Sequence, residues 1–424
     1  MHIREDSFSM ADSYASEIED LLDPGSKDPS VLYLQAEHRS TNIWKAGGGY
    51  SQRSRVRNKF TSIHPRMVPH LIDMHFDGVA RLSGIHIDWS LVTALVERWR
   101  PETHTFHFPV GECTITLQDV SILLGLRVDG NIMIGSTDFK GGWAKIIHDM
   151  FGEAPKENSN DLVGGRLKLS WLSKKFDALA DDADDDEVIR HTYAFMLQLI
   201  GGVLFTDHQG SQVHYMFILV IQNLERNSKL SWGSVVLAFL YRELCKACKI
   251  GVKEIAGCVL LLQLWAWTRL PTLAPIPRAP CSDNQDIWAD VIGPFGLSDV
   301  SSHVVSVNRL SLDVLTPNHF IWLPYDDILE KLPEHCKQDQ ALWCYKGPLI
   351  WFYIVKSHQP DRCVRQFGMI QDVPLAPDIY SADLHNINLK GKTDVNWRDK
   401  HREHISYWDK RKEHGYILTM LVLG

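Results

Sequence analysis

Hydrophobic positions along most of the chain recur at the spacing of amphipathic helices. From Trp89 to Trp99, apolar side chains return every three or four residues, which predicts a helix with one buried face. Asp88 stands where an N-cap residue would accept hydrogen bonds from backbone N–H groups. Pro101 disfavours a helical conformation in the residue before it, so the helix is predicted to lie between Asp88 and Pro101.

The periodicity changes to two over the next stretch. Side chains at 103, 105 and 107 alternate with His104, Phe106 and Phe108, and a turn-like sequence follows at 109–112. This pattern predicts a β-hairpin. Thr116 and Asp119 then have the spacing of a capping box, and Gly125 suits the C-terminal end of a helix, so a helix is predicted over 117–124.

The remainder of the chain has a largely helical pattern. Ser170 and Ser231 are predicted N-caps, and the four prolines between 271 and 280 predict a rigid extended connector. A strand-like run covers Leu349–Val355, and Pro360 is predicted to open a short helix. Further helices are predicted at 171–179, 188–203, 213–224, 231–249, 254–270, 326–332 and 396–413.

No fixed-period repeat is visible, so a solenoid is not expected. The predicted fold class is mainly α, with a single large helical domain, a few short β-hairpin elements and a disordered acidic N-terminal tail. Residues 1–60 are predicted to be disordered or linker, 61–415 to form the domain, and 416–424 to form an apolar tail.

Composition supports a packed domain. The 424 residues are 45% hydrophobic and 23% charged, so a sizeable core can form. Tryptophan occurs 14 times, which favours a Trp-rich core over the alternative of a stacking or peptide-binding surface. The longest apolar run, Ile255–Trp267, is shorter than the roughly 20 residues of a bilayer span, so no membrane contact is predicted.

The net charge of −8 means that any contact with nucleic acid must come from a local patch. Two patches are candidates. The first follows three glycines at 47–49 and is interpreted as the solvated face of a flexible link, with phosphate contact as the alternative. It consists of Arg53, Arg55, Arg57 and Lys59.

The second basic patch lies in the predicted C-terminal helix, where Trp397 and Trp408 are interleaved with basic residues. Basic side chains that snorkel over a packed Trp stripe are the favoured interpretation. Nucleic-acid contact, which basic residues with aromatics can make, is the alternative. The basic residues are Arg398, Lys400, Arg402, Lys410 and Arg411.

Catalytic signatures are weak. Cys245 and Cys248 lack a second ligand pair for zinc and are predicted to be reduced core cysteines. The acidic run 181–187 lacks the spacing of a calcium loop and is predicted to be a solvated loop before a helix. Asp207, His208, Ser211 and His214 lack the nucleophile elbow of a hydrolase, and 401–404 lacks the zinc-protease spacing. We predict no catalytic residue, no cofactor and no metal site, and a chain that is not an enzyme.

Four stretches, at 99–107, 116–120, 202–205 and 358–368, together resemble the plant mobile domain family. Within that family, two further stretches are most similar to the MAIN-like group: Asp28-Pro29-Ser30-Val31-Leu32 and His64-Pro65-Arg66-Met67-Val68-Pro69. The likeness covers the chain broadly from Pro29 to the last helix, and Tyr416–Gly424 departs from the usual polar, longer ending. The stretches are Trp99-Arg100-Pro101-Glu102-Thr103-His104-Thr105-Phe106-His107, Thr116-Leu117-Gln118-Asp119-Val120, Gly202-Val203-Leu204-Phe205 before Asp207, and His358-Gln359-Pro360-Asp361-Arg362 with Arg365-Gln366-Phe367-Gly368.

The resemblance implies a nuclear plant protein that acts in transcriptional silencing of transposable elements, genome stability and meristem cell fate. It implies a protein partner, which the family suggests is a plant type 7 phosphatase-like protein. Relatives inside transposons imply the alternative of a transposon-derived nucleic-acid-binding protein. The chain lacks the metal motifs of such a phosphatase, so the resemblance carries no catalytic activity over to it.

Overall fold

The computed structural model describes residues 30–43, 51–57, 59–60, 62–134, 142–156, 159–208, 210–222, 228–275, 304–377 and 395–414. Helices dominate these residues, and the strands form small antiparallel sheets, which confirms the predicted mainly α class. The predicted acidic tail over 1–29, the glycines at 47–49 and the apolar tail at 416–424 lie outside the described residues.

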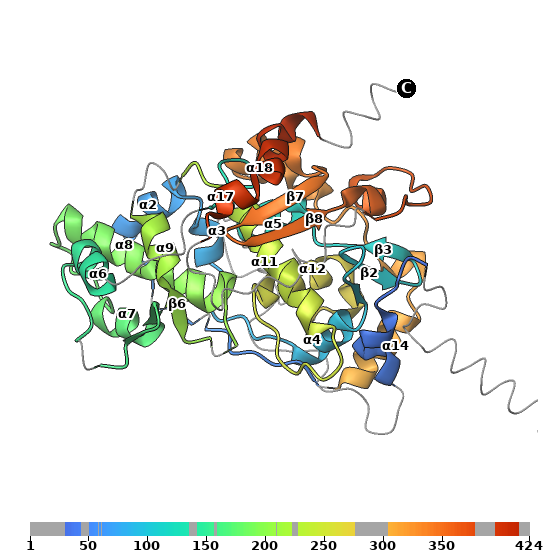
Figure 1. Cartoon of the computed structure of the whole chain (residues 1–424), viewed down its shortest axis with the longest axis horizontal. Helices are drawn as coiled ribbons and strands as arrows, with labels where there is room; N and C mark the ends of the chain where they lie inside the picture. Colours follow the sequence, from blue (N-terminus) through green and yellow to red (C-terminus); the bar gives the residue numbers. More distant parts are fainter. Residues whose placement is uncertain are drawn as a thin grey trace, which may run out of the picture.

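Most of the α-helices are short, and α8 and α11 are the longest of those described. Figure 1 shows α6–α9 at one edge of the molecule and α11 and α12 near its centre. The helices are α2 Val68–Asp73, α3 Asp77–Ala80, α4 Trp89–Val96, α5 Leu117–Leu124, α6 Trp143–Phe151, α7 Leu169–Lys175, α8 Asp185–Leu199, α9 Tyr215–Ile221, α11 Trp232–Ala247, α12 Val259–Arg269, α14 Val305–Asp313, α15 Glu334–Gln338, α17 Trp397–Lys400 and α18 Arg402–Asp409.

Shorter helical turns connect these helices. One of them, η4, is a π-helical turn that continues α8. The turns are η1 Gln35–Glu37, η2 Arg39–Asn42, η3 Pro65–Met67, η4 Ile200–Leu204, η5 Pro271–Leu273, η6 Pro317–His319, η7 Asp326–Lys331, η8 Gln340–Leu342, η9 Pro360–Phe367 and η10 Arg411–Glu413.

The strands form three small sheets with the orders β1-β2-β3, β4-β5-β6 and β7-β8. In the predicted hairpin, Phe106 pairs with both Trp99 and Cys113, which confirms that hairpin and adds a third strand to it. The strands are β1 Trp99–Arg100, β2 Thr105–Phe108, β3 Gly111–Cys113, β4 Leu162–Val163, β5 Arg166–Lys168, β6 Gln212–His214, β7 Gly347–Trp351 and β8 Ile354–His358.

One continuous hydrophobic core extends from Met67 to Trp408. Helix α11 packs against α5, β1, β7 and β8, and α12 packs against α4 and α5. Tryptophans that are less than 2% exposed confirm the predicted Trp-rich core, and they are Trp99, Trp232, Trp265, Trp397 and Trp408. In the described part of the chain, no helix combines the length and apolar character that a membrane crossing requires.

Two predicted helix starts are confirmed in atomic detail. The Asp88 carboxylate accepts hydrogen bonds from the backbone N–H groups of Ser90 and Leu91, which opens α4. Thr116 and Asp119 form the predicted capping box of α5, and Gly125 closes that helix in the left-handed region at φ +66°. Local sequence therefore defines both ends of α5.

Several predicted boundaries were wrong. Trp99 lies in β1, because α4 ends at Val96. Ser170 lies inside α7 rather than capping it. Ser231 does stand directly before α11 as predicted, but its hydroxyl hydrogen-bonds the Val128 carbonyl and Ser234 Oγ and caps no backbone N–H group. The predicted single strand over 349–355 is a hairpin of β7 and β8.

The prolines and the C-terminal segment also differ from the prediction. Pro271 opens a 3-10 turn, η5, rather than an extended connector, and residues 276–280 lie outside the described part. The predicted helix over 396–413 is divided into α17, α18 and η10, with a break at His401.

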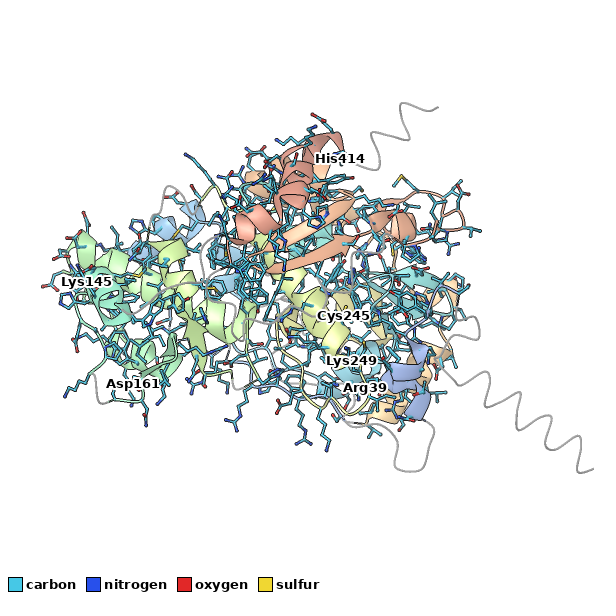
Figure 2. The ribbon with its side chains drawn as sticks, viewed as in Figure 1. Arg39, Lys145, Asp161, Cys245, Lys249 and His414 are labelled. Atoms are coloured by element: carbon cyan, nitrogen blue, oxygen red, sulfur yellow. The ribbon has the colours of Figure 1, made fainter. Side chains whose placement is uncertain are left out.

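Residues 30–43 pack onto the domain near the end of α11. The Arg39 N–H donates to the Cys248 carbonyl (2.7 Å), and the Ile250 N–H donates to the Glu37 carbonyl (3.0 Å). Arg39 and Lys249 lie close together in Figure 2, and Cys245 lies further toward the centre. This part of the predicted linker is therefore packed structure.

Candidate functional site

Residues 51–57 cross the domain as an extended segment that we call the basic strap, together with Lys59 and Phe60. The Gln52 N–H donates to Thr93 Oγ1 (2.8 Å), and the Arg57 N–H donates to the Gly202 carbonyl (3.0 Å). Arg53 forms a parallel bridge with Glu254. The structure therefore differs from the predicted flexible link, because the backbone of the strap is tethered along its length.

Two glycines allow the strap to lie close to the domain. A Cβ atom on Gly202 would lie 2.5 Å from the Arg57 carbonyl oxygen. A Cβ atom on Gly210 would collide with the Arg55 carbonyl, and Gly210 also has φ +56°, which favours glycine. The close approach of the strap backbone therefore requires glycine at both of these positions of the domain.

The basic side chains of the strap face solvent although its backbone is held. Arg53, Arg55, Arg57 and Lys59 are all exposed. No ion pair joins any of them to a carboxylate in the described part of the chain. These cations are therefore available for a ligand of opposite charge.

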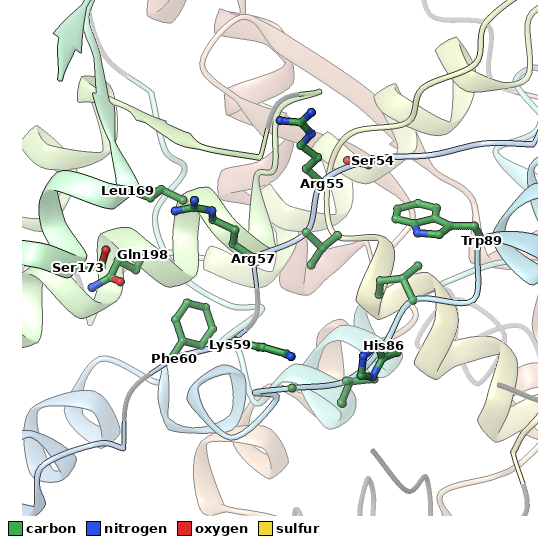
Figure 3. Close-up of a pocket in the computed structure, with 14 residues that line it drawn as sticks. Ser54, Arg55, Arg57, Lys59, Phe60, His86, Trp89, Leu169, Ser173 and Gln198 are labelled. Atoms are coloured by element: carbon green, nitrogen blue, oxygen red, sulfur yellow. The ribbon is translucent and has the colours of Figure 1, made fainter. Parts of the chain in front are cut away.

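A cavity of about 560 Å³ lies along the strap. Figure 3 shows the strap between α7 and α8 on one side and His86 and Trp89 on the other, with Arg57 directed toward the first side and Lys59 toward the second. Among the described residues, no carboxylate lines the cavity, which we call the basic groove. Its lining residues are Ser54, Arg55, Val56, Arg57, Lys59, Phe60, Gly84, Ile85, His86, Ile87, Trp89, Leu169, Ser173 and Gln198.

Two aromatic rings border the basic groove. Trp89 is the first residue of α4, so the Asp88 cap fixes its position. Phe60 packs edge-on against Phe195 of α8, with ring centroids 5.6 Å apart. Both rings are partly buried against the core and present their remaining surface to the groove. Sequence reasoning missed Phe60, Trp89 and His86 as site residues, because only the folded chain brings them beside the strap.

The C-terminal basic residues are partly neutralised. Arg411 donates to Asp129 (Nε to Oδ1, 2.7 Å) and lies over the Trp408 ring. Burial acts to raise the pKa of Asp129, but hydrogen bonds from Arg411 and Lys412 lower it overall. Arg402 pairs with Asp399 (2.9 Å), so Arg402 and Arg411 already have carboxylate partners.

The other predicted C-terminal contacts are Arg398, Lys400 and Lys410, and all three are exposed. Lys400 lies over the Trp397 ring, with its Nζ 5.4 Å from the ring centroid. Figure 1 shows α17 and α18 at the top of the molecule, whereas the basic strap crosses its lower part. The fold therefore does not bring the two predicted basic patches together into one surface.

The weak catalytic candidates have contacts that fit structural roles. Asp207 accepts hydrogen bonds from Arg166 and from the Gly210 N–H, whereas His208 faces Glu254. His214 accepts from the Met216 N–H at the start of α9. These contacts stabilise the loop over 207–210 and the first turn of α9.

The cysteines and the acidic run, which were the candidates for a thiol or metal site, have structural positions in the fold. Cys245 and Cys248 are buried free thiols, and burial raises the pKa of Cys248 well above its ordinary value, which suppresses the thiolate. The acidic run leads into α8 with Asp184 as its N-cap. Over the described ranges, no group of three His, Cys, Asp or Glu side chains is arranged to hold a metal ion.

The motif at 99–107 holds the N-terminal segment. His38 donates from Nε2 to the Trp99 carbonyl and accepts at Nδ1 from Arg100, both at 2.8 Å. The Glu102 carboxylate accepts from the Leu34 N–H (2.7 Å). Burial, reinforced by the Arg100 charge, lowers the pKa of His38 to about 3, so His38 is neutral at physiological pH.

His38 is expected to make the domain sensitive to acid. Its folded pKa of about 3 lies below the ordinary histidine value of about 6.5. The unfolded chain therefore gains a proton first as the pH falls, and stability is lost between about pH 6.5 and 3. We expect His38→Gln to reduce the loss of unfolding free energy between pH 7 and 5, by up to about 1.4 kcal/mol per pH unit, in urea titrations.

The matched control for His38 is His148→Gln, because His148 is 63% exposed. It should leave the pH dependence unchanged. If His38→Gln and His148→Gln lose stability equally between pH 7 and 5, His38 does not contribute to acid sensitivity.

The other motifs also form the interior. Asp119 pairs with Arg269 (2.8 Å), and both side chains are fully buried. Arg362 forms a two-pronged ion pair with Glu112 at 2.7 and 2.6 Å. Gln366 hydrogen-bonds both the N–H and the carbonyl of Thr114, each at 2.8 Å. The polar side chains of these motifs therefore join distant segments of the domain.

Together these features define a mainly helical domain whose sequence motifs build interior ion pairs and whose exposed basic strap lines one groove. The family model for the plant mobile domain matches residues 75–421. The chain belongs to the plant mobile domain family.

Relatives from Arabidopsis thaliana support this assignment. The chain is 40% identical to "Serine/threonine-protein phosphatase 7 long form homolog" over 406 residues, which cover 92% of this chain and 30% of that protein. It is 33% identical to "Protein MAIN-LIKE 2", covering 93% of this chain and 58% of the relative. It is 33% identical to "Protein MAINTENANCE OF MERISTEMS", covering 81% of this chain and 71% of the relative. The chain thus spans less than two thirds of the first two relatives, and no solved structure matches it.

Proposed function

We propose that this chain is a non-enzymatic nuclear interaction protein that acts in transcriptional silencing of transposable elements. Genome stability and maintenance of meristem cell fate would follow from that silencing. The observation that carries the proposal is that polar side chains of the motifs form ion pairs within the domain: Asp119 pairs with Arg269, and Arg362 pairs with Glu112. This arrangement favours a protein that acts through its surfaces.

The partner we propose is a plant type 7 phosphatase-like protein. Among the relatives, one that contains a region similar to nearly the whole of this chain is named as a phosphatase 7 long form homolog. Such a partner needs a docking surface, and the exposed apolar side chains of α14 provide one.

Helix α14 has an apolar face directed to solvent. Its inner face carries Arg309 and Leu312, which are buried against the domain. A surface helix normally places polar residues outward, so exposed apolar residues at helical spacing indicate an interaction surface. We call these residues the α14 stripe: Val304, Val307, Leu310 and Val314, each between 50% and 58% exposed.

Charging the α14 stripe is expected to abolish partner capture. Because Val307 and Leu310 are half exposed, Val307→Glu with Leu310→Glu should leave the melting temperature almost unchanged. The phosphatase-like partner recovered with the tagged chain from nuclease-treated nuclei should fall at least tenfold by quantitative mass spectrometry.

The matched control is Ile370→Glu with Val373→Glu, since these side chains are 88% and 92% exposed and lie outside the stripe. This control should capture the partner normally. Equal capture by both double variants would contradict the α14 site. Loss of the partner on nuclease treatment of the unaltered protein would contradict a direct protein complex.

Nucleic-acid binding is the second candidate function, as a transposon-derived nucleic-acid-binding protein. The specific observation that favours it is the basic groove, whose described lining has three cationic side chains and no carboxylate.

A further inference from the structure

We propose that the basic groove is a binding site for single-stranded nucleic acid. In this proposal Arg55, Arg57 and Lys59 contact phosphates, and Trp89 and Phe60 provide surfaces on which bases stack. The inference rests on the second candidate function and is independent of the proposed protein partner.

The charge of the groove favours a polyanion. The whole chain carries a net charge of −8. The groove has three exposed cations and, in the part of its lining that the structure describes, no carboxylate, so its local charge is opposite in sign to that of the chain. Arg55, Arg57 and Lys59 occupy alternate positions along the strap, and two residues of extended chain advance by about 6.6 Å. Cations in a row of this kind can follow the phosphates of a strand laid along the groove.

The strap is preorganised for this contact. Its backbone is held by the Arg57–Gly202 hydrogen bond (3.0 Å) and by the bridge from Arg53 to Glu254. Close approach at Gly202 and Gly210 fixes the depth of the strap in the domain. A ligand therefore meets cations that are already positioned, which lowers the entropic cost of binding.

The aromatic rings distinguish a single strand from other polyanions. Trp89 and Phe60 border the cavity from different elements, and each is partly exposed. Unpaired bases can stack on such rings, whereas the bases of a duplex are already stacked on one another. An acidic or phosphorylated peptide could also pair with the cations. Such a peptide does not carry an aromatic ring at every residue, so it would make less use of Trp89 and Phe60. Ser173 and Gln198 add hydrogen-bonding groups on the α7–α8 side.

The test is fluorescence anisotropy of the full chain with labelled single-stranded DNA and RNA of about 12 nucleotides, a length within the range of single-strand sites. We expect Arg55→Gln with Arg57→Gln and Lys59→Gln to weaken binding at least tenfold. The slope of log affinity against log salt should become less negative by about 2, because each lost phosphate contact contributes about 0.7. Trp89→Leu should weaken binding about tenfold and leave the slope unchanged.

The matched control removes three exposed charges from the other patch: Arg398→Gln with Lys400→Gln and Lys410→Gln. We expect this variant to bind as the unaltered chain does, and thermal unfolding should confirm that both triple variants are folded. If only the control variant loses binding, the groove is the wrong site and the second candidate function stands.

Two further outcomes would overturn the proposal. If neither oligonucleotide binds at low salt, both the groove and the second candidate function fall. If a phosphorylated or polyglutamate peptide binds more tightly than the oligonucleotides and the groove variant abolishes that binding, the groove binds an acidic protein segment instead. Duplex DNA that binds as tightly as the single strands would exclude base stacking.

Discussion

Asp119→Ala is expected to lower the free energy of unfolding by about 3–5 kcal/mol, because it leaves a buried arginine without its counter-charge. Arg269 and Asp119 are both 0% exposed, and Arg269 Nη2 lies 2.8 Å from Asp119 Oδ1. The Tyr325 hydroxyl donates to the same carboxylate oxygen at 2.7 Å. The alanine variant would therefore leave a charge and a hydroxyl unsatisfied in the core.

Urea denaturation of Asp119→Ala should show this loss as a lower midpoint with an unchanged slope. Asp399→Ala is the control, since its partner Arg402 is 79% exposed and an exposed pair contributes at most about 1 kcal/mol. Replacing both buried charges, as in Asp119→Leu with Arg269→Met, should recover part of the loss. If Asp119→Ala costs no more than Asp399→Ala, the buried pair does not hold the core together.

The two roles of Asp119 illustrate what sequence alone can predict. Its capping box with Thr116 spans three residues, so the spacing is sufficient to predict it. Its ion pair joins it to a residue 150 positions away, and no local pattern indicates that partner. The sequence was sufficient to predict that helices α4, α5, α8, α11 and α12 form, because each of them buries an apolar face.

The sequence did not predict turns that lack the usual turn residues glycine, asparagine, aspartate and proline. The β7–β8 hairpin turns at Phe352 and Tyr353, and Phe352 adopts φ +47°. Asn or Gly at such a position would have signalled a hairpin, whereas two aromatics extend the apparent strand. Tertiary packing therefore determines this turn.

The sequence predicts the basic residues of the candidate site but not the groove that they line. The basic residues of the strap could be located from their spacing, but their polar sequence resembles a linker because the side chains face solvent. The strap is held by a backbone hydrogen bond at Gly202 and lies close to the backbone at Gly210, and the aromatic border comes from elements distant in sequence. A groove assembled from several segments needs the fold before its residues can be grouped.

Glu97→Ala is expected to release α14 from the domain. Glu97 is fully buried and receives two hydrogen bonds from Arg309, both at 2.7 Å, while Arg39 lies 3.8 Å away. Removing the carboxylate takes away the negative charge that the two guanidinium groups share, at an expected cost of about 3–5 kcal/mol. Arg309 lies near the surface, so detachment of α14 can return its charge to water.

The cost of Glu97→Ala should therefore appear first as local opening. Amide hydrogen exchange over residues 305–313 should become at least about a hundredfold faster, which corresponds to roughly 3 kcal/mol. Exchange in α11 should change less, since α11 lies in the central core. Glu403→Ala, at an exposed position on α18, is the control and should alter neither region. Because α14 carries the stripe at which we expect the partner to dock, its release should also reduce partner capture. Unchanged exchange over 305–313 would mean that apolar packing and the buried Arg98–Asp313 ion pair hold this helix without Glu97, and the interaction surface would then not depend on Glu97.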